Sequence, residues 1–191
     1  MKKTSKHEEI FKTALELIAE RGFHGVSMSL IAEKADVGTG TIYRYFKSKD
    51  DLITALHRNL EEKISAYISD GYAEDQPLKE RYVHLVKKIM MYFITYPLHY
   101  RYMEQFFNSP YGVSLHRERL LQKSGNHDIL TNVFVHGIQQ HIVKDLPKAV
   151  LFSLTIGPII SLTRYHALGL AEIDDTLVGK ITEACWDGVK R

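Results

Sequence analysis

Apolar positions along this chain recur about every 3.6 residues, the period of an α-helix. The first instance opens with a capping box at Ser5 and Glu8 and ends at Gly22, a typical helix stop. One face of that segment carries Phe11, Ala14, Leu15 and Ile18. Runs of strictly alternating apolar residues, which mark strands, are scarce. The pattern therefore predicts an all-α protein.

Capping residues, glycines and prolines divide the rest of the chain into further helices. Ser27 and Ser48 are suited to start helices, and Gly169 is suited to end one. Residues 111–125 are ambiguous, although 115–123 can be helical. Pro158 lies inside an expected helix, where it should kink the helix or remove one backbone hydrogen bond. Beyond the short helix that Ser27 caps, the expected ranges are 39–46, 48–68, 78–96, 98–108, 127–143, 148–168 and 174–190.

The pattern of residues 27–46 predicts two short helices joined by a tight turn at Val37 and Gly38. Ile42 and Phe46 are four residues apart and are expected to face the core, whereas the second helix otherwise carries aromatic and basic side chains. This layout is typical of a helix-turn-helix whose second helix reads the major groove of DNA.

Several side chains of this segment suit contact with DNA. Ser27 offers a hydroxyl and backbone N–H groups at a helix start. Gly40 has no side chain, which permits close approach, and Thr41 offers a methyl group for a thymine methyl. Tyr43 and Tyr45 are two residues apart, so at least one is exposed with its hydroxyl available to phosphate.

The stretch from about Ile10 to Leu56 resembles the TetR family of bacterial transcriptional regulators. From Ile31 it reads Ile-Ala-x-x-Ala-x-Val-x-x-Gly-Thr-Ile-Tyr-x-Tyr-Phe-x-x-Lys, a long and specific combination. Asp36 stands where the family usually has glycine, and aspartate tolerates left-handed turn geometry better than most residues.

The resemblance implies a fold and a set of contacts. The fold would be an N-terminal three-helix DNA-binding domain in residues 1–50 and a larger helical ligand-binding and dimerisation domain in 51–191, with about nine helices. The implied phosphate contacts are Ser27, Tyr43, Tyr45 and Lys49. The positions nearest base edges would be Ser29, Thr39, Gly40, Thr41 and Arg44.

Some of these assignments have simpler alternatives. Arg44 can be a solvated charge only, and the Thr39 side chain is short for direct base contact. Lys2, Lys3 and Lys6 can form an arm along DNA or a disordered basic tail.

The segment 149–168 is apolar around most of its circumference, so it must bury more than one face. The resemblance implies that the last two helices form a four-helix bundle with a second subunit, and the alternative is a fully intramolecular core. Cys185 is most simply a small buried hydrophobic residue. The expected interface residues are Leu154, Ile159, Leu162, Tyr165, Leu177, Ile181 and Cys185.

Residues 89–111 are rich in methionine and aromatic side chains. Such a stripe can be plain core, or it can line an adaptable cavity for a lipophilic or aromatic effector. The expected pocket residues are Tyr92, Phe93, Tyr96, Tyr102, Met103, Phe106, Phe107 and His136.

Composition narrows the class of protein. Of 191 residues, 45% are hydrophobic and 25% charged, which is normal for a globular chain. The net charge of +2 equals the excess of nine Lys/Arg over seven Asp/Glu in residues 1–50, where the DNA-binding motif lies. The start lacks the apolar run of a signal peptide, and the single cysteine permits no intramolecular disulfide, so a cytoplasmic protein is expected.

Motifs of catalysis and metal binding are missing from the sequence. There is no His-Glu-x-x-His, no P-loop and no dinucleotide fingerprint. His136 and His141 are five residues apart, which places them on different helix faces. We therefore expect no enzyme activity, no cofactor and no metal. The expected function is ligand-responsive repression: a homodimer binds a palindromic DNA operator and is released by a small effector. A helix-turn-helix adaptor that binds protein is the alternative.

Overall fold

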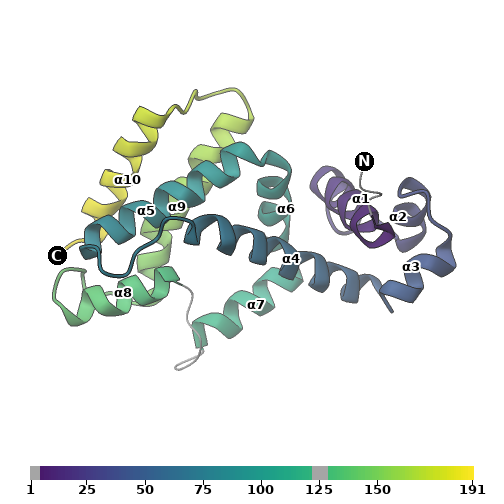
Figure 1. Ribbon diagram of the computed structural model, residues 1–191, viewed down its shortest axis with the longest axis horizontal. Helices are drawn as coiled ribbons and strands as arrows, with labels where there is room; N and C mark the ends of the chain where they lie inside the picture. The colour runs from purple at the N-terminus through teal and green to yellow at the C-terminus, as the bar shows by residue number, and fades with distance from the viewer. Residues whose placement is uncertain (1–4, 122–128) are drawn as a thin grey trace. The chain divides into compact units, whose positions relative to one another are not determined.

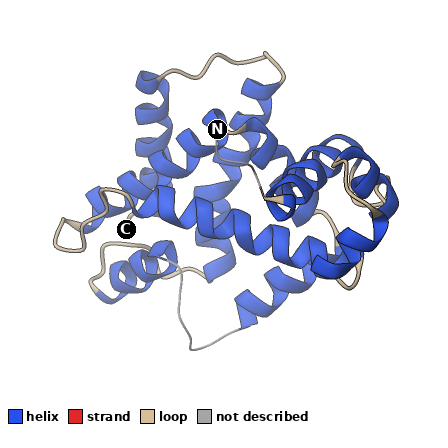
Figure 2. Cartoon of the chain, turned by 45° about the vertical axis from the view of Figure 1, so that its right-hand side comes forward, coloured by secondary structure: helices blue, strands red, loops and turns tan. Residues whose placement is uncertain are grey.

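The computed structural model describes residues 5–121 and 129–191, with the backbone alone for 116–121. Ten helices and no strands occur among these residues (Figures 1 and 2). They divide into two compact units. The first comprises the chain up to Lys63 with Pro97–Ser114, and the second comprises Ile64–Tyr96 with the described residues from Leu115 on. The prediction of an all-α fold is confirmed.

The first unit contains α1 to α3, most of α4, α6 and the start of α7. Ser5 and Glu8 form the expected capping box, with Ser5 N to Glu8 Oε2 at 2.9 Å, and Gly22 ends α1 with φ 67°. Helix α1 packs on α6 and α2, and α2 packs on α3. The bounds are α1 (Lys6–Arg21), α2 (Met28–Lys34), α3 (Thr39–Tyr45), α4 (Lys49–Ser69), α6 (Pro97–Phe107) and α7 (Pro110–Leu121).

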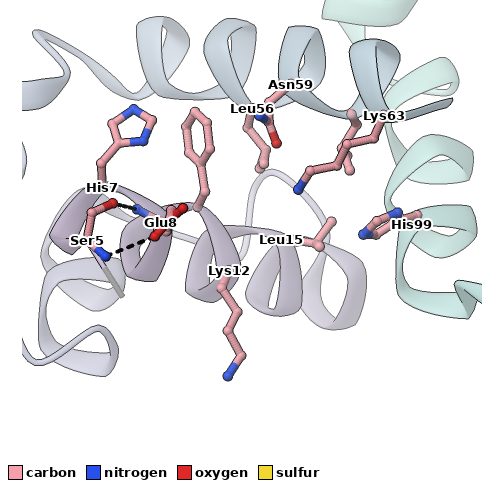
Figure 3. Close-up of a pocket in the computed structure, with 11 residues that line it drawn as sticks. Ser5, His7, Glu8, Lys12, Leu15, Leu56, Asn59, Lys63 and His99 are labelled. Atoms are coloured by element: carbon pink, nitrogen blue, oxygen red, sulfur yellow. Dashed lines mark hydrogen bonds between the residues drawn. The ribbon is translucent and has the colours of Figure 1, made fainter. Parts of the chain in front are cut away.

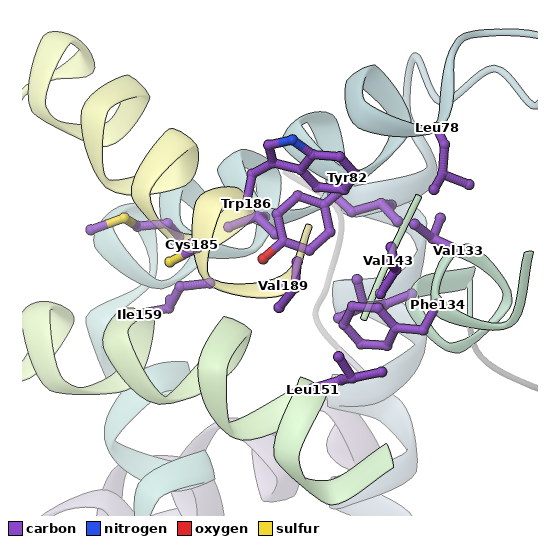
Figure 4. Packing of buried hydrophobic residues seen from close by; sticks show 14 of the residues in the cluster. Leu78, Tyr82, Val133, Phe134, Val143, Leu151, Ile159, Cys185, Trp186 and Val189 are labelled. Atoms are coloured by element: carbon purple, nitrogen blue, oxygen red, sulfur yellow. The ribbon is translucent and has the colours of Figure 1, made fainter. Parts of the chain in front are cut away.

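The second unit contains α5 (Leu78–Thr95), α8 (Ile129–Gln139), α9 (Lys148–Ala167) and α10 (Asp175–Val189). Helix α5 packs against α8, α9 and α10. Tyr82 lies at the centre of this core, with its ring 5.1 Å from that of Trp186 and its hydroxyl 2.9 Å from Thr155 Oγ1 (Figure 4). Burying the hydroxyl is tolerated because it is hydrogen-bonded.

Two boundaries differ from the expectation. Helix α7 begins at Pro110, directly before the segment 111–125 that the sequence left ambiguous, because proline suits the first position of a helix as well as the position after one. Helix α8 ends at Gln139 and not near Val143. His141 adopts φ 57°, and the N–H groups of Ile142 and Val143 donate to the Gly137 carbonyl, which terminates the helix.

Candidate DNA-binding surface

Helix α3 has one buried side and one exposed side. Ile42 and the C-terminal cap Phe46 are buried, as their spacing predicted, and they anchor the helix on the first unit. Tyr43 and Tyr45 are 50% and 43% exposed. Arg44, Thr39 and Gly40 are also exposed, and Thr41 is half-buried. The predicted phosphate and base contacts of α3 therefore share a surface that its own fold does not cover.

Ser27 caps the start of α2, and its Oγ accepts a hydrogen bond from Leu30 N at 3.2 Å and lies 3.0 Å from Ser29 Oγ. Both serines are exposed. A hydroxyl that accepts from a backbone N–H still has its own proton to donate, so capping and phosphate contact are compatible. The turn to α3 places Asp36 at φ 50°, as the substitution of aspartate for glycine predicted.

Gly40 is not required by the packing of its own helix. A Cβ built on it would meet no heavy atom within 4 Å. A glycine whose surroundings are open favours a role at a surface that another molecule approaches closely.

Lys49 is held by the loop between α1 and α2, because its ammonium donates a hydrogen bond to the Phe23 carbonyl. An ammonium has three protons, so two remain for other acceptors. The structure thus gives Lys49 a structural role beside the predicted phosphate contact.

His7 is a neighbour of the surface that sequence reasoning missed. Its ring centroid lies 5.6 Å from that of Tyr45, 5.4 Å from that of Phe46 and 4.4 Å from that of Phe11. His7 therefore supports the end of α3 from α1. No local spacing could reveal this contact, because the partners are almost 40 positions apart in the chain.

The residues predicted to line a ligand pocket divide between the two units. Tyr92 and Phe93 are buried in the second unit, where Tyr96 and His136 are exposed. The first unit holds the other four on α6: Tyr102, Met103 and Phe106 are buried, and Phe107 is 40% exposed.

The α6 residues pack on α4 and on the loop between α1 and α2 in the first unit. Phe23 lies 5.8 Å from the Tyr102 ring and 6.2 Å from the Phe106 ring. The Tyr102 hydroxyl donates to the Ile53 carbonyl of α4 at 3.4 Å. Phe106 stacks at 3.6 Å on the buried ring of His57 in α4. A displacement of α6 would therefore disturb both α4 and the α1–α2 loop.

Among the residues predicted to line the ligand pocket, the buried phenols Tyr92 and Tyr102 stay uncharged near neutral pH. Burial, with a smaller contribution from Tyr96, raises the pKa of Tyr92 to about 12. Burial also raises the pKa of Tyr102 well above that of a free phenol, with Glu61 adding to it. These side chains suit uncharged or lipophilic parts of a ligand.

Helices α9 and α10 both expose apolar side chains. Leu154 and Tyr165 of α9 are 38% and 47% exposed, and Leu177 of α10 is 37% exposed. Leu162 and Ile181 are half-buried, whereas Ile159 and Cys185 are enclosed by their own chain. Burial raises the pKa of the Cys185 thiol, which makes it a poor nucleophile.

Among the side chains that the structure describes, in residues 5–115 and 129–191, no group of three or more His, Cys, Asp or Glu could hold a metal ion. None of the helices among the described residues combines the length and the apolar character needed to cross a bilayer.

Two short helices joined by a tight turn, the second exposed on one side and anchored by buried apolar residues, are the arrangement of a helix-turn-helix DNA-binding protein. Residues 10–56 match the family model described as bacterial regulatory proteins of the tetR family. Residues 77–190 match the model of the tetracyclin repressor-like C-terminal domain. The chain belongs to the TetR family of bacterial transcriptional regulators, as its motif predicted.

Three related proteins match this chain over nearly its full length. An HTH-type transcriptional regulator of Haemophilus influenzae is 24% identical over 190 residues, covering 99% of this chain and 98% of that protein. A TetR-family regulator of Marinobacter aquaeolei has the same fold, with a TM-score of 0.84 and 22% identity. The match covers 97% of this chain and 95% of that one. FadR of Bacillus subtilis, solved in complex with stearoyl-CoA, gives a TM-score of 0.72 and 23% identity. The match covers 95% of this chain and 98% of that one.

Proposed function

We propose that this protein is a ligand-responsive repressor that binds a palindromic operator as a homodimer and is released by a small lipophilic or aromatic effector. The observation that carries the proposal is the exposed face of α3, where Thr39, Gly40, Tyr43 and Arg44 surround the buried anchor Ile42. A dimer bound at a promoter would repress transcription by blocking access to that promoter. The match to a repressor-like C-terminal domain supports repression over activation.

On DNA, the phenol hydroxyls of Tyr43 and Tyr45 would meet phosphate oxygens, together with Ser27 and Lys49. Such contacts fix register and carry no sequence information. Base reading would fall to Arg44 and to the short side chains near Gly40. Specificity would therefore rest on few direct contacts, with spacing and DNA shape supplying the rest.

The exposed apolar side chains of α9 and α10 support self-association. Leu154, Tyr165 and Leu177 would be covered by the same residues of a second copy, as a two-fold interface requires. The dimer would set two α3 helices roughly 34–36 Å apart, one turn of the duplex, which makes the operator an inverted repeat.

Release would follow from a shift in population. An effector that binds a conformation with wider-spaced recognition helices would draw the protein away from DNA, with a coupling of about 1–3 kcal/mol. The packing of Tyr102 and Phe106 on α4 and the Phe23 loop supports α6 and α4 as the route. Stearoyl-CoA, which the similarly folded FadR binds, is the first effector to test.

The test is binding of the purified protein to duplexes from its own promoter region and to random DNA, followed by fluorescence anisotropy. Tyr43→Ala should weaken both complexes by a similar factor, because a phosphate contact is insensitive to sequence. Tyr43→Phe keeps the ring and should lose only the hydroxyl contribution. Wild-type protein that binds no duplex would refute the proposal and favour a protein-binding adaptor, and unchanged affinity in Tyr43→Ala would remove that residue from the contacts.

A further inference from the structure

The first unit contains a groove between α1, α4 and α6 that none of the assigned DNA, ligand or dimer residues lines (Figure 3). Its volume is about 480 Å³, within the size range of small-molecule sites. Phe11, Leu15 and Leu56 give it an apolar wall, and Asn59, Lys63 and His99 lie at its polar end.

The groove is lined by the lysine Lys63 and by the carboxylate Glu8, whose pKa is lowered mainly by its hydrogen bonds with Ser5 and slightly by the positive charge of Lys63. The Lys63 ammonium reaches into the space between α4 and α1, whereas Lys12 points away from it (Figure 3). Lys63 forms no hydrogen bond or ion pair with any residue that the structure describes. Glu8 also lines the groove, but its carboxylate accepts the Ser5 N–H at 2.9 Å in the capping box.

His99 adds a neutral polar group beside this cation. Burial lowers the pKa of His99, and the positive charge of Lys63 lowers it further. Since the charged form of the imidazole is disfavoured, Lys63 remains the main electrostatic attraction for a ligand at neutral pH.

We propose that this groove is a second ligand site, which takes a small amphipathic carboxylate. The carboxylate would pair with Lys63 and accept a hydrogen bond from the Asn59 amide. Its apolar tail would lie against Phe11, Leu15 and Leu56. An anion with an apolar body suits Lys63 and the apolar wall, provided that its carboxylate lies at Lys63 and away from Glu8, whereas a cation at that position would be repelled by Lys63.

The walls of the groove also support the end of α3. Phe11 stacks on Phe46 with ring centroids 5.5 Å apart, and the His7 ring packs against Tyr45 at 5.6 Å. An occupant that contacts these rings would therefore be coupled to the DNA-binding surface, and DNA would alter its affinity by the same factor. This coupling rests on the proposed function, whereas ligand binding does not.

The test is a titration of the full chain with octanoate in the absence of DNA. Binding is monitored through the NMR signals of the His7 and His99 rings. His7→Gln and His99→Gln assign the signals. In the wild type, the ring signals of His7 and His99 should both shift until the site is saturated. The pKa of His99 should rise because the bound carboxylate offsets the charge of Lys63. Lys63→Met should weaken binding at least tenfold, whereas Lys12→Met, the matched control, should bind as the wild type does.

Octylammonium has the same tail and the opposite charge, and it should not saturate the site. Equal binding of octanoate by Lys63→Met, equal binding of octylammonium, or the absence of saturable shifts would overturn the proposal. Saturating octanoate should then change operator affinity in the wild type and not in Lys63→Met. Octanoate binding in a protein that binds no DNA would refute the proposed function and leave the site standing.

Discussion

Replacing Gly40 by alanine separates the folding of α3 from its approach to DNA. The added methyl meets no heavy atom within 4 Å, and Gly40 is not among the glycines with positive φ. Alanine is favoured over glycine inside a helix by ~0.5–1 kcal/mol. For a chain of this length, such a gain raises Tm by up to roughly 2–4 °C.

The same methyl lies on the exposed side of α3, where the helix is proposed to meet base edges. Holding the helix back from one half-site should cost about 1 kcal/mol, the lower end of the range for a lost base contact. Two half-sites bring the loss to about 2 kcal/mol, which corresponds to a roughly 30-fold weaker complex. Gly40→Ala is thus expected to be more stable and to bind DNA less tightly.

The two quantities are measured by thermal unfolding and by anisotropy with an operator duplex. Gly179→Ala is the matched control, since its methyl in α10 also meets nothing within 4 Å. It should gain similar stability and bind as the wild type does. Wild-type affinity in Gly40→Ala, at equal or higher Tm, would refute the close approach of α3 at this position.

Three further changes test other parts of the account. Arg44→Ala should alter base preference at one position per half-site in a DNA selection, and an unaltered preference would mean that Arg44 reads no base. Leu154→Glu should yield monomers by light scattering, whereas Val113→Glu, at a more exposed apolar position on α7 outside the proposed interface residues, should leave the dimer intact; a dimeric Leu154→Glu contradicts the interface. Gly137→Ala should lower the free energy of unfolding in urea by about 1–3 kcal/mol, because its Cβ would come within 2.4 Å of Val143 Cγ2, and unchanged stability would argue against this packing.

Local signals in the sequence were enough to predict the helix-turn-helix. The serine caps at 5 and 27, the spacing of Ile42 and Phe46, and the aspartate at 36 each act within a few residues, and each has the predicted geometry. Helix ends were harder where one residue type serves two roles. The sequence pattern leaves residues 111–125 ambiguous, because Pro110 both follows the end of α6 and begins α7.

Features that depend on contacts between distant segments could not be predicted from the sequence. The uniform apolar character of 149–168 predicted two buried faces but could not distinguish Ile159, which is enclosed by its own chain, from Leu154, which is exposed. The support of Tyr45 by His7 and the bond from Lys49 to the Phe23 carbonyl join segments far apart in the chain. Periodicity carries no information about such partners.

The most direct test of a dimeric DNA-binding repressor is selection by the full-length protein from a library of random duplexes, with the retained DNA sequenced. We expect enrichment of an inverted repeat whose half-site centres lie about 10–10.5 base pairs apart, or a multiple of that distance. No enrichment, or enrichment of a single unrepeated half-site, would contradict it.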